Sequence, residues 1–320
     1  MKEKIMENVK VSVICLVYNH EKYLRKCLDG FVSQECDFKY EVLIHDDAST
    51  DSSASIIREY EEKYPEIIKP IYQTENQHSK GIKISKTHLL PKARGEYLAW
   101  CEGDDFWTSP HKLQKQVDFL DANQDYSACV HRATLCECTT GQKSIFPNIS
   151  ASRDYTTNEI IKAGGGIFAT NSFMIRKDLY CEKPECFSAK GFGDYQLFIY
   201  ASIVGKVYCF FDVMSQYNYL TSGSWSARNQ NKEKRIKHSK AIIEMLNVVN
   251  AYYDYKYDEA IKQKILRSEF NIDLFLGNKK ELRSKKYKAI RKEYRKNRFK
   301  ERLKKAFPFL KRLKYKLLKK

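Results

Sequence analysis

The sequence has few long apolar runs for a chain of 320 residues. Its first apolar run, Val11 to Tyr18, is shorter than a signal-peptide core with its flanks and far too short to cross a bilayer. The later runs are shorter or are interrupted by charged residues. A membrane-spanning segment is therefore not expected, and any membrane contact should be peripheral.

The cysteines lack the spacing of metal or disulfide frameworks. Ten are irregularly spaced, and Cys136 and Cys138 are the only close pair. There is no C-x-x-C pair and no Cys/His array with zinc-finger spacing, and His20 and His45 have no second ligand at metal-binding spacing. Because small disulfide scaffolds need denser cysteine, we interpret the cysteines as reduced thiols of a cytoplasmic protein.

Glycine-rich phosphate loops and internal repeats are also missing. The one glycine run, Gly164 to Gly166, does not have the order G-x-G-x-x-G and does not follow the first predicted strand. It is therefore interpreted as a turn. Hydrophobic residues make up 42% and aromatic residues 13% of the chain, which is typical of a packed globular protein.

Acidic residues are scarce in the C-terminal segment. The chain has a net charge of +17, but residues 279–320 contain 21 Lys or Arg and 3 Asp or Glu, so residues 1–278 carry a net charge of −1. Apolar residues recur at helical spacing from Lys285 onward, and Pro308 is expected to divide this tail into two helices. A basic amphipathic helix favours an anionic membrane surface. A solvated, partly disordered tail is the alternative, and no recognition motif supports nucleic-acid binding.

Buried-strand and amphipathic-helix patterns alternate through the first half of the chain. The first strand is continuous in apolar residues, as is typical of a parallel strand buried on both faces. Pro70 places the third strand near a sheet edge or a bulge. The expected strands are 11–18, 40–45, 67–72 and 96–101, and the expected helices are 21–34, a segment capped by Asp51, and 79–93. This order predicts an α/β fold with a doubly wound, mostly parallel sheet.

The second half is predicted to complete this domain and then to become helical. The expected elements are a helix from Pro110 to Ala122, strands at 126–130, 172–177 and 206–211, a helix near 195–202, and irregular chain over 139–166. From Lys232 the pattern is helical, and after Gly277 it is densely basic. We therefore expect a main domain over 1–230, a helical extension over 231–278 and a basic amphipathic tail over 279–320.

Polar residues stand at the ends of three predicted parallel strands. In open α/β sheets, ligands bind outside the carboxyl ends of the strands. The residues are Val17, Tyr18, Asn19 and His20 after the first strand, Asp46, Asp47 and the residues to Asp51 after the second, and Glu102, Gly103, Asp104, Asp105, Phe106 and Trp107 after the fourth. Three such strand ends are harder to explain by chance than one, so the sequence predicts a binding crevice there.

Three segments at these strand ends resemble successive signatures of the family 2 glycosyltransferases. They are VSVICLVYNHEKYLRKCLDGFVSQ, YEVLIHDDASTDSS and GEYLAWCEGDDFWTSPHKLQKQ. Their order and spacing match over roughly residues 9–125, and the resemblance continues more weakly to Arg228. It implies a GT-A fold, a nucleoside-diphosphate sugar donor and a divalent metal, with donor binding in 9–125 and the acceptor and catalytic part in 126–230.

The resemblance also implies roles for the acids. Asp47 corresponds to the family's uracil-reading acid, with capping of the next helix as the alternative role of Asp46 and Asp47. The D-x-D region of the family corresponds to Glu102–Asp105, although the family pattern usually begins with Asp. Asp105 is expected to bind the metal, and Asp104 the ribose or the metal. A diphosphate leaving group is a hard ligand, which suits Mn²⁺ or Mg²⁺.

Asp194 is the expected general base. It lies in the segment GFGDY, which resembles the family's acidic motif at a helix start, although an Asp at this position also commonly serves as a helix cap. As the base, Asp194 would take the acceptor hydroxyl proton while that oxygen attacks the anomeric carbon. The transition state resembles an oxocarbenium ion, and a single in-line displacement inverts the anomeric centre.

Weaker candidates complete the predicted donor site. Lys80 and Arg94 are placed where cations can approach the diphosphate, with surface solvation as the alternative. Other residues occupy positions where family members place groups that cover the donor or acceptor: Tyr219, Ser224, Trp225 and Arg228. Trp225 can equally be an ordinary core anchor.

Together these residues predict an inverting glycosyltransferase that uses a UDP-sugar or another nucleoside-diphosphate sugar. The expected acceptor is a glycan or lipid-linked molecule in cell-surface polysaccharide synthesis, and the expected location is cytoplasmic, peripheral at the inner face of the cell membrane. One alternative is a nucleotidyltransferase, which should carry a Gly-rich, cationic loop where this chain has YNHEKYLRK. The other is a non-catalytic basic membrane- or RNA-binding protein on a degenerate transferase fold.

Overall fold

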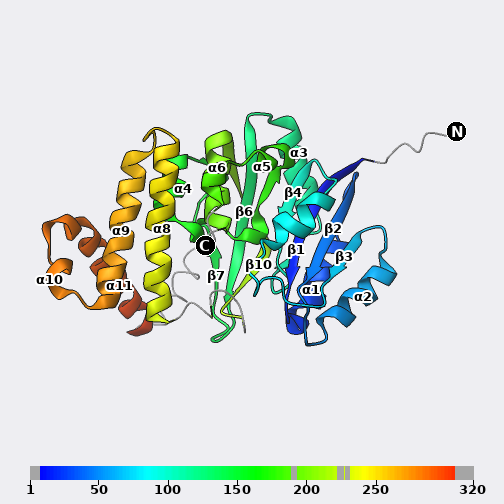
Figure 1. Ribbon diagram of the computed structural model, residues 1–320, viewed down its shortest axis with the longest axis horizontal. Coiled ribbons are helices and arrows are strands. Elements are labelled where there is room, and N and C mark those ends of the chain that lie inside the picture. Colours follow the sequence, from blue (N-terminus) through cyan, green and yellow to red (C-terminus); the bar gives the residue numbers. More distant parts are fainter. Residues whose placement is uncertain (1–7, 189–192, 222–226, 228–230, 307–320) are drawn as a thin grey trace, which may run out of the picture. The chain divides into compact units, whose positions relative to one another are not determined.

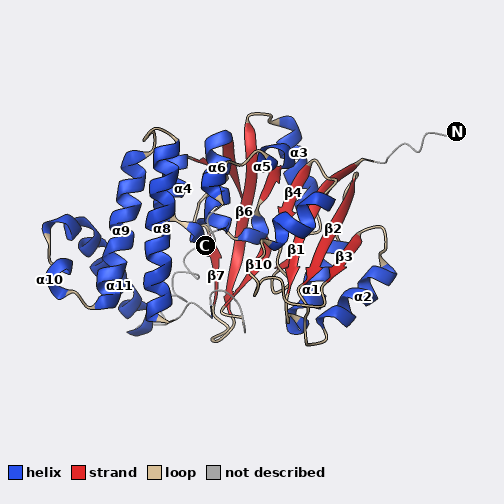
Figure 2. Ribbon diagram, viewed as in Figure 1, coloured by secondary structure: helices blue, strands red, loops and turns tan. Residues whose placement is uncertain are grey.

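The computed structural model describes residues 8–188, 193–221, 227 and 231–306, with side chains as far as Phe299. The chain divides into two compact units, unit 1 (Met1–Gln230) and unit 2 (Asn231–Lys320). Unit 1 is a sheet with helices packed against it, and unit 2 is helical (Figures 1 and 2).

Parallel strands form the N-terminal half of unit 1. They are β1 (Val9–Val17), β2 (Lys39–Asp46), β3 (Ile68–Tyr72) and β4 (Tyr97–Trp100). Their order in the sheet is β3-β2-β1-β4, and each neighbouring pair is parallel. Pro70 lies in β3, the strand at the sheet edge, where a residue without an N–H is tolerated.

The helices α1 (Glu21–Val32) and α2 (Ser53–Lys63) connect the first three strands. The apolar positions of α1 recur at helical spacing, so that one stripe of the helix is buried: Leu24, Cys27, Leu28 and Phe31. Phe31 packs edge-on against Trp107, with ring centroids 4.9 Å apart. This contact places the C-terminal end of α1 beside β5 (Phe106–Trp107), in the chain that follows β4.

The sheet continues into the second half of unit 1, and ten strands belong to it within the described residues. The added strands are β5 (Phe106–Trp107), β6 (Tyr126–Glu137), β7 (Lys143–Phe146), β8 (Arg153–Tyr155), β9 (Met174–Arg176) and β10 (Lys206–Tyr219). The order from β4 onward is β4-β9-β6-β10-β5. The β6–β10 pair is parallel, whereas β9 is antiparallel to both of its neighbours. The predicted α/β fold with a mostly parallel sheet is confirmed.

Helices pack against this part of the sheet. They are α3 (Lys112–Ala122), α4 (Thr157–Ala163), α5 (Lys177–Cys181) and α6 (Gly193–Val204). Helix α6 is buried along most of its length, from Tyr195 to Ala201. Its N-terminus carries Asp194, so the packing of this helix fixes the position of the predicted base.

Several sequence predictions need correction. Residues 79–93 form only a short π-helical turn, Ser85–Leu89, and a 3₁₀ turn, Leu90–Lys92, because the preceding loop is held elsewhere by hydrogen bonds described below. The segment 139–166 is not irregular, since it contains β7, β8 and α4. The second helix has Ser52 as its N-cap, and Asp51 instead accepts a hydrogen bond from the Ser53 amide at 2.9 Å.

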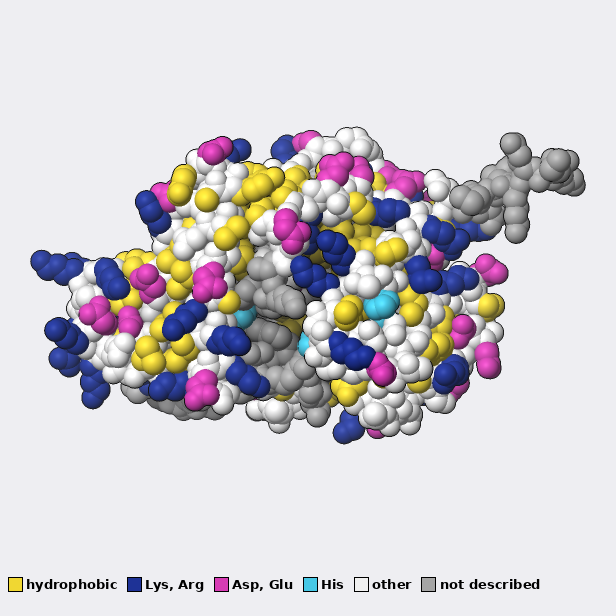
Figure 3. Space-filling model, viewed as in Figure 1, with side chains coloured by type: hydrophobic (Ala, Val, Ile, Leu, Met, Phe, Trp, Pro, Cys, Tyr) yellow, Lys and Arg dark blue, Asp and Glu magenta, His cyan; other side chains and the backbone are white. Residues whose placement is uncertain are grey.

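Unit 2 consists of α8 (Lys232–Tyr252), α9 (Asp258–Leu276), α10 (Lys279–Leu282) and α11 (Lys288–Ala306). Figure 3 shows Lys and Arg side chains gathered at the α10 end of this unit. The first part of the basic tail packs on α9: Tyr287 is fully buried and donates to Asp273 at 2.8 Å. The predicted break at Pro308 lies outside the described residues. No helix in the described part of the chain is long and apolar enough to cross a membrane.

Candidate active site

The loops that follow β1 and β2 are joined by hydrogen bonds. The Asp47 amide donates to the Val17 carbonyl at 2.9 Å, and the Thr50 amide donates to Asn19 Oδ1 at 2.8 Å. Asn19 has a positive φ of 58°, which turns its side chain toward the second loop. Tyr18 remains 45% exposed. The structure thus brings together the candidates at these two strand ends and leaves one aromatic ring accessible.

Asp46 and Asp47 have different surroundings. Asp46 is 2% exposed, and no described residue donates to its Oδ1 atom. Burial raises the pKa of the Asp46 carboxyl, although hydrogen bonds from Ser49 oppose the shift. Both oxygens of Asp47 accept backbone hydrogen bonds, from Gln77 at 2.7 Å and from His78 at 3.0 Å. Asp47 therefore holds the loop after β3, whereas Asp46 is a buried acid with an unused oxygen.

The two cations predicted to approach the diphosphate, Lys80 and Arg94, lie in different parts of unit 1. Lys80 belongs to the loop held by Asp47 and forms an ion pair with Glu75. Arg94 donates to the buried Glu41 at 2.6 Å, and Glu41 also accepts from Ser12, near the start of β1. Arg94 thus lies away from the carboxyl ends of the strands and cannot reach a diphosphate bound there. Trp225 lies outside the described residues.

The turn after β4 fits closely against the first loop. The Gly103 amide donates to the Leu16 carbonyl at 3.0 Å. A Cβ atom added to Gly103 would lie 2.9 Å from both His20 Nδ1 and Val17 Cγ2, so a side chain there requires neighbouring atoms to move. Burial lowers the pKa of His20, while the charges of Asp104, Asp51 and Asp46 raise it. This histidine therefore stands among carboxylates from all three strand ends.

Asp105 is tied into the protein interior. It is 3% exposed, and its Oδ1 accepts from the Asn218 amide at 2.7 Å, while its Oδ2 accepts from Asn171 Nδ2 at 3.1 Å. Burial, then the charge of Asp104, raises the pKa of Asp105 well above its ordinary value. Its partners come from β10 and from the turn before β9, so Asp105 links three segments that are distant in sequence.

Asp104 is held by residues at the end of β10 and just after it. Its Oδ2 accepts from Thr221 Oγ1 at 2.7 Å, and its backbone carbonyl accepts from Asn218 Nδ2 at 2.6 Å. Glu102, two residues earlier, is exposed. The Asp104 side chain is therefore held by Thr221, and Glu102 lies at the exposed side of the same turn.

Asp194 lies at the start of α6, partly exposed at the surface. Its Oδ1 accepts from the Tyr195 amide at 2.7 Å. Burial raises the pKa of the Asp194 carboxyl despite this hydrogen bond. A Cβ atom added to Gly165 would lie 3.6 Å from Asp194 Oδ1, so the glycine run packs close to the carboxylate. The run Gly164–Gly166, which was predicted only as a turn, therefore also packs close to the Asp194 carboxylate.

Tyr217 on β10 was missed by the sequence analysis. Its pKa is raised, first by burial and then by the negative charges of Asp105, Glu102, Asp104 and Asp194. One phenol therefore senses both the acids of the β4 turn and the acid of α6. An aromatic residue at the end of a strand gives no distinctive sequence signal, so only the folded sheet shows that Tyr217 joins the two groups.

The carboxylate oxygens of the β4 turn are suited to a hard cation that binds together with a phosphate ligand. Among the described residues, no cluster of three or more His, Cys, Asp or Glu side chains could hold a metal ion. Mg²⁺ and Mn²⁺ in nucleotide sites commonly use one or two carboxylates, with substrate phosphates and water completing the shell. Asp104, with Glu102 in the same turn, supplies oxygen ligands of that kind.

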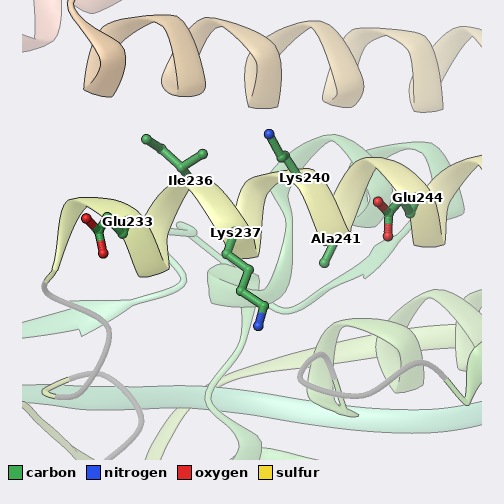
Figure 4. Close-up of a pocket in the computed structure, with 6 residues that line it drawn as sticks. All are labelled: Glu233, Ile236, Lys237, Lys240, Ala241 and Glu244. Atoms are coloured by element: carbon green, nitrogen blue, oxygen red, sulfur yellow. The ribbon is translucent and has the colours of Figure 1, made fainter.

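A separate concave surface runs along α8 and contains none of the predicted site residues. It is lined by Glu233, Ile236, Lys237, Lys240, Ala241 and Glu244. Figure 4 shows Ile236 and Lys240 projecting from one side of the helix and Lys237 from the other. Because these side chains diverge, they do not form a convergent ligand site.

Comparison with known proteins agrees with this geometry. The model of the family described as glycosyl transferase family 2 matches residues 12–181, more than half of the chain. The chain belongs to glycosyl transferase family 2.

A curated relative and a solved structure extend the comparison. The uncharacterized protein Rv1520 of Mycobacterium tuberculosis is 34% identical over 225 residues, which are 70% of this chain and 63% of that protein. The chain therefore matches less than two thirds of that relative. The mannosyltransferase PcManGT of Pyrobaculum calidifontis, solved with GDP-Man and Mn²⁺, has a TM-score of 0.56 and 18% identity, covering 85% of this chain and 74% of that chain. This likeness supports the GT-A-type fold.

A shorter match is to an enzyme that acts on a ribitol-phosphate polymer. The poly(ribitol-phosphate) beta-glucosyltransferase of Bacillus spizizenii is 34% identical over 117 residues, which are 36% of this chain and 18% of that protein.

Proposed function

We propose that unit 1 transfers a sugar from a nucleoside-diphosphate sugar to an acceptor hydroxyl, with inversion at the anomeric carbon. The observation that carries this proposal is that hydrogen bonds join the acid-bearing strand ends, because the Asp47 amide donates to the Val17 carbonyl at 2.9 Å and the Gly103 amide donates to the Leu16 carbonyl at 3.0 Å. The β4 turn supplies Asp104 and Asp105, and α6 supplies Asp194. A transferase needs acids of both kinds, because one group must neutralise a leaving diphosphate and another must accept a proton.

Asp104 is our preferred metal ligand in this proposal. Asp105 was the first choice from sequence and stays a candidate, but both of its oxygens already accept hydrogen bonds and its side chain is almost fully buried. In the Asp104 carboxylate, Oδ2 accepts a hydrogen bond from Thr221 Oγ1 at 2.7 Å. A bound Mn²⁺ or Mg²⁺ would supply positive charge to the diphosphate as it leaves. Asp105 then acts as a positioning residue that fixes the turn.

Asp194 is the proposed general base. Burial raises its pKa, which makes the carboxylate a stronger proton acceptor than an ordinary aspartate. The hydrogen bond from the Tyr195 amide holds one oxygen in place. The other oxygen is the one proposed to take the proton of the acceptor hydroxyl. Tyr217, whose pKa is raised by burial and by the charges of this acid and the acids of the β4 turn, is proposed to contact the sugar that is transferred.

Tyr18 and Asp47 are proposed to bind the nucleobase. The exposed ring of Tyr18 offers a stacking surface, and the Asp47 carboxylate accepts N–H groups. Uracil and guanine both present an N–H donor to such an acid, whereas adenine presents an acceptor at its ring nitrogen. The resemblance to uracil-reading members makes a UDP-sugar the preferred donor, and the guanosine donor of PcManGT makes a GDP-sugar the competing one. Val17, Asn19, Asp46 and Lys80 remain proposed members of the same subsite.

The acceptor is proposed to be a cell-surface glycan or a lipid-linked precursor, at the inner face of the membrane. The similarity to the poly(ribitol-phosphate) beta-glucosyltransferase of Bacillus spizizenii supports a polymer acceptor. The basic tail supports attachment to anionic lipid. Family membership favours glycosyl transfer over nucleotidyl transfer and over a non-catalytic role.

A donor panel tests the proposal. Purified full-length protein is melted with UDP-, GDP-, ADP- and CDP-sugars, each with Mn²⁺ and with EDTA, and donor hydrolysis is then measured for each donor that stabilises the protein. We expect metal-dependent stabilisation by a uridine or guanosine donor and slow release of its diphosphate. Stabilisation by no donor, or equal stabilisation by all four bases, would contradict the proposed site.

A further inference from the structure

Unit 2 contains a groove that none of the proposed donor-site residues lines. It lies between α9, α10 and α11, which are neighbours within this unit (Figure 1). Its aromatic members are Phe270, Tyr294 and Phe299, and its cationic members are Arg291, Arg295 and Arg298. A groove with an aromatic floor and a cationic rim combines apolar contact with attraction for an anion.

The aromatic floor of the groove combines Phe270 of α9 with Tyr294 and Phe299 of α11. Phe270 is 3% exposed and packs edge-on against Tyr294, with ring centroids 5.7 Å apart. Phe299 is 63% exposed and stands at the end of the groove. Exposure of so much apolar surface is unfavourable in water, so burial of Phe299 against a ligand would stabilise the bound state.

The cationic rim has no described counter-ion. The three arginines follow one face of α11, because their spacing corresponds to about one and two helical turns. Arg291 is fixed by hydrogen bonds to the carbonyls of Leu282 at 2.7 Å and Ser284 at 2.6 Å. Among side chains that the structure describes, no carboxylate forms an ion pair with any of the three, and Glu293 of the same helix pairs with Arg267 at 2.6 Å instead.

We infer that this groove binds the phosphate and glycerol-ester region of an anionic phospholipid at a bilayer surface. Planar guanidinium groups bind phosphate through two parallel hydrogen bonds, and aromatic side chains favour the membrane interface. The segment 307–320 is a poor competitor for the groove, since it contains six Lys or Arg and no acid. The inference gives the proposed membrane attachment a defined site, and it does not depend on sugar transfer.

Two charge-matched double variants of the full chain test this inference. Arg295→Gln/Arg298→Gln removes two charges from the groove, and Lys292→Gln/Lys296→Gln removes two charges from exposed positions of the same helix that do not line it. Binding to phosphatidylcholine vesicles with and without phosphatidylglycerol is measured by sedimentation. We expect the arginine pair to raise the Kd for the anionic vesicles at least about tenfold more than the lysine pair. Equal losses of vesicle affinity in the two double variants would mean that the attraction is diffuse and electrostatic, and would overturn the inference that the groove binds lipid.

Further measurements keep the inference testable if a double variant folds poorly. Phe299→Ala leaves the charge unchanged, and we expect it to weaken binding to the same vesicles several-fold. Unchanged binding by this variant would overturn the proposed lipid contact. Inorganic phosphate, added at the concentration of accessible lipid phosphate, should not release the wild-type chain. Release by inorganic phosphate would assign the groove to free phosphate instead of lipid.

Discussion

Replacement of the two adjacent acids Asp104 and Asp105 separates metal binding from structural support. Asp105→Ala removes the acceptor of the Asn218 amide and one of the two acceptors of Asn171 Nδ2, which still donates to the Gln216 carbonyl, in a buried site. Each buried unsatisfied donor costs about 1–3 kcal/mol, so the free energy of unfolding should fall by about 2–6 kcal/mol. Asp104→Ala removes the hydrogen bond from Thr221 and should lower the free energy of unfolding by only about 1 kcal/mol.

For nucleotide binding, the substitution of Asp104 should have a larger effect than the substitution of Asp105, which is the opposite of their order for stability. A ligand present at about 100 times its Kd stabilises the folded protein by about 2.7 kcal/mol. We expect Asp104→Asn to lose the Mn²⁺-dependent part of the stabilisation by UDP or GDP, and Asp105→Asn to keep much of it on a less stable fold. Urea unfolding gives the stability, and thermal shifts with Mn²⁺ or EDTA give the binding. If Asp105→Asn alone abolished the metal dependence while Asp105→Ala unfolded like wild type, the reasoning would be refuted.

Three other substitutions test separate parts of the site. Asp194→Asn should reduce the rate of sugar transfer by about 10²–10⁴ with donor binding intact. It should also remove the acid limb of the pH–rate profile, which lies above the usual range of aspartate because the pKa of Asp194 is raised. Asp178→Asn, at another helix start with a similar amide contact, is the control and should remain active. Asp46→Asn should stabilise the ligand-free protein at pH 7 by about 1 kcal/mol. The raised pKa of Asp46 makes the folded state bind more protons, so wild-type stability falls as pH rises from 3.8 through that pKa, and urea unfolding at acidic pH should show the two proteins converging. Gly103→Ala should lower the free energy of unfolding by about 1–3 kcal/mol and weaken donor binding, because the added Cβ contacts His20 and Val17. Gly166→Ala is the control: nothing lies within 4 Å of its added Cβ, so this variant should have the melting temperature of the wild type.

The sequence was sufficient to predict the parallel half of the sheet. The apolar run of β1 and the helical stripe of α1 are local patterns, and the acids at the strand ends follow from the sheet order. Long-range hydrogen bonds were not predictable in this way. The loop containing Lys80 is not helical because Asp47, about thirty residues earlier in the chain, holds its backbone.

The same limit applies to the roles of individual site residues. From sequence, Asp104 and Asp105 are adjacent acids that differ little, and their hydrogen-bond partners on β10 and before β9 are more than sixty residues away. Tyr217 likewise comes under the charges of both groups of acids only in the folded sheet, where β10 pairs with β6. Spacing identifies which residue types gather at a sheet edge, but packing decides which oxygen remains available.

The hold of Asp47 on the loop after β3 has a kinetic consequence. The amides of Gln77 and His78 now occupy the carboxylate that is proposed to read the nucleobase. A base that hydrogen-bonds to Asp47 must share these acceptor atoms or release the two amides. Hydrogen–deuterium exchange at Gln77 and His78 would then become faster, not slower, when the donor is added, which is unusual for residues beside an occupied ligand site.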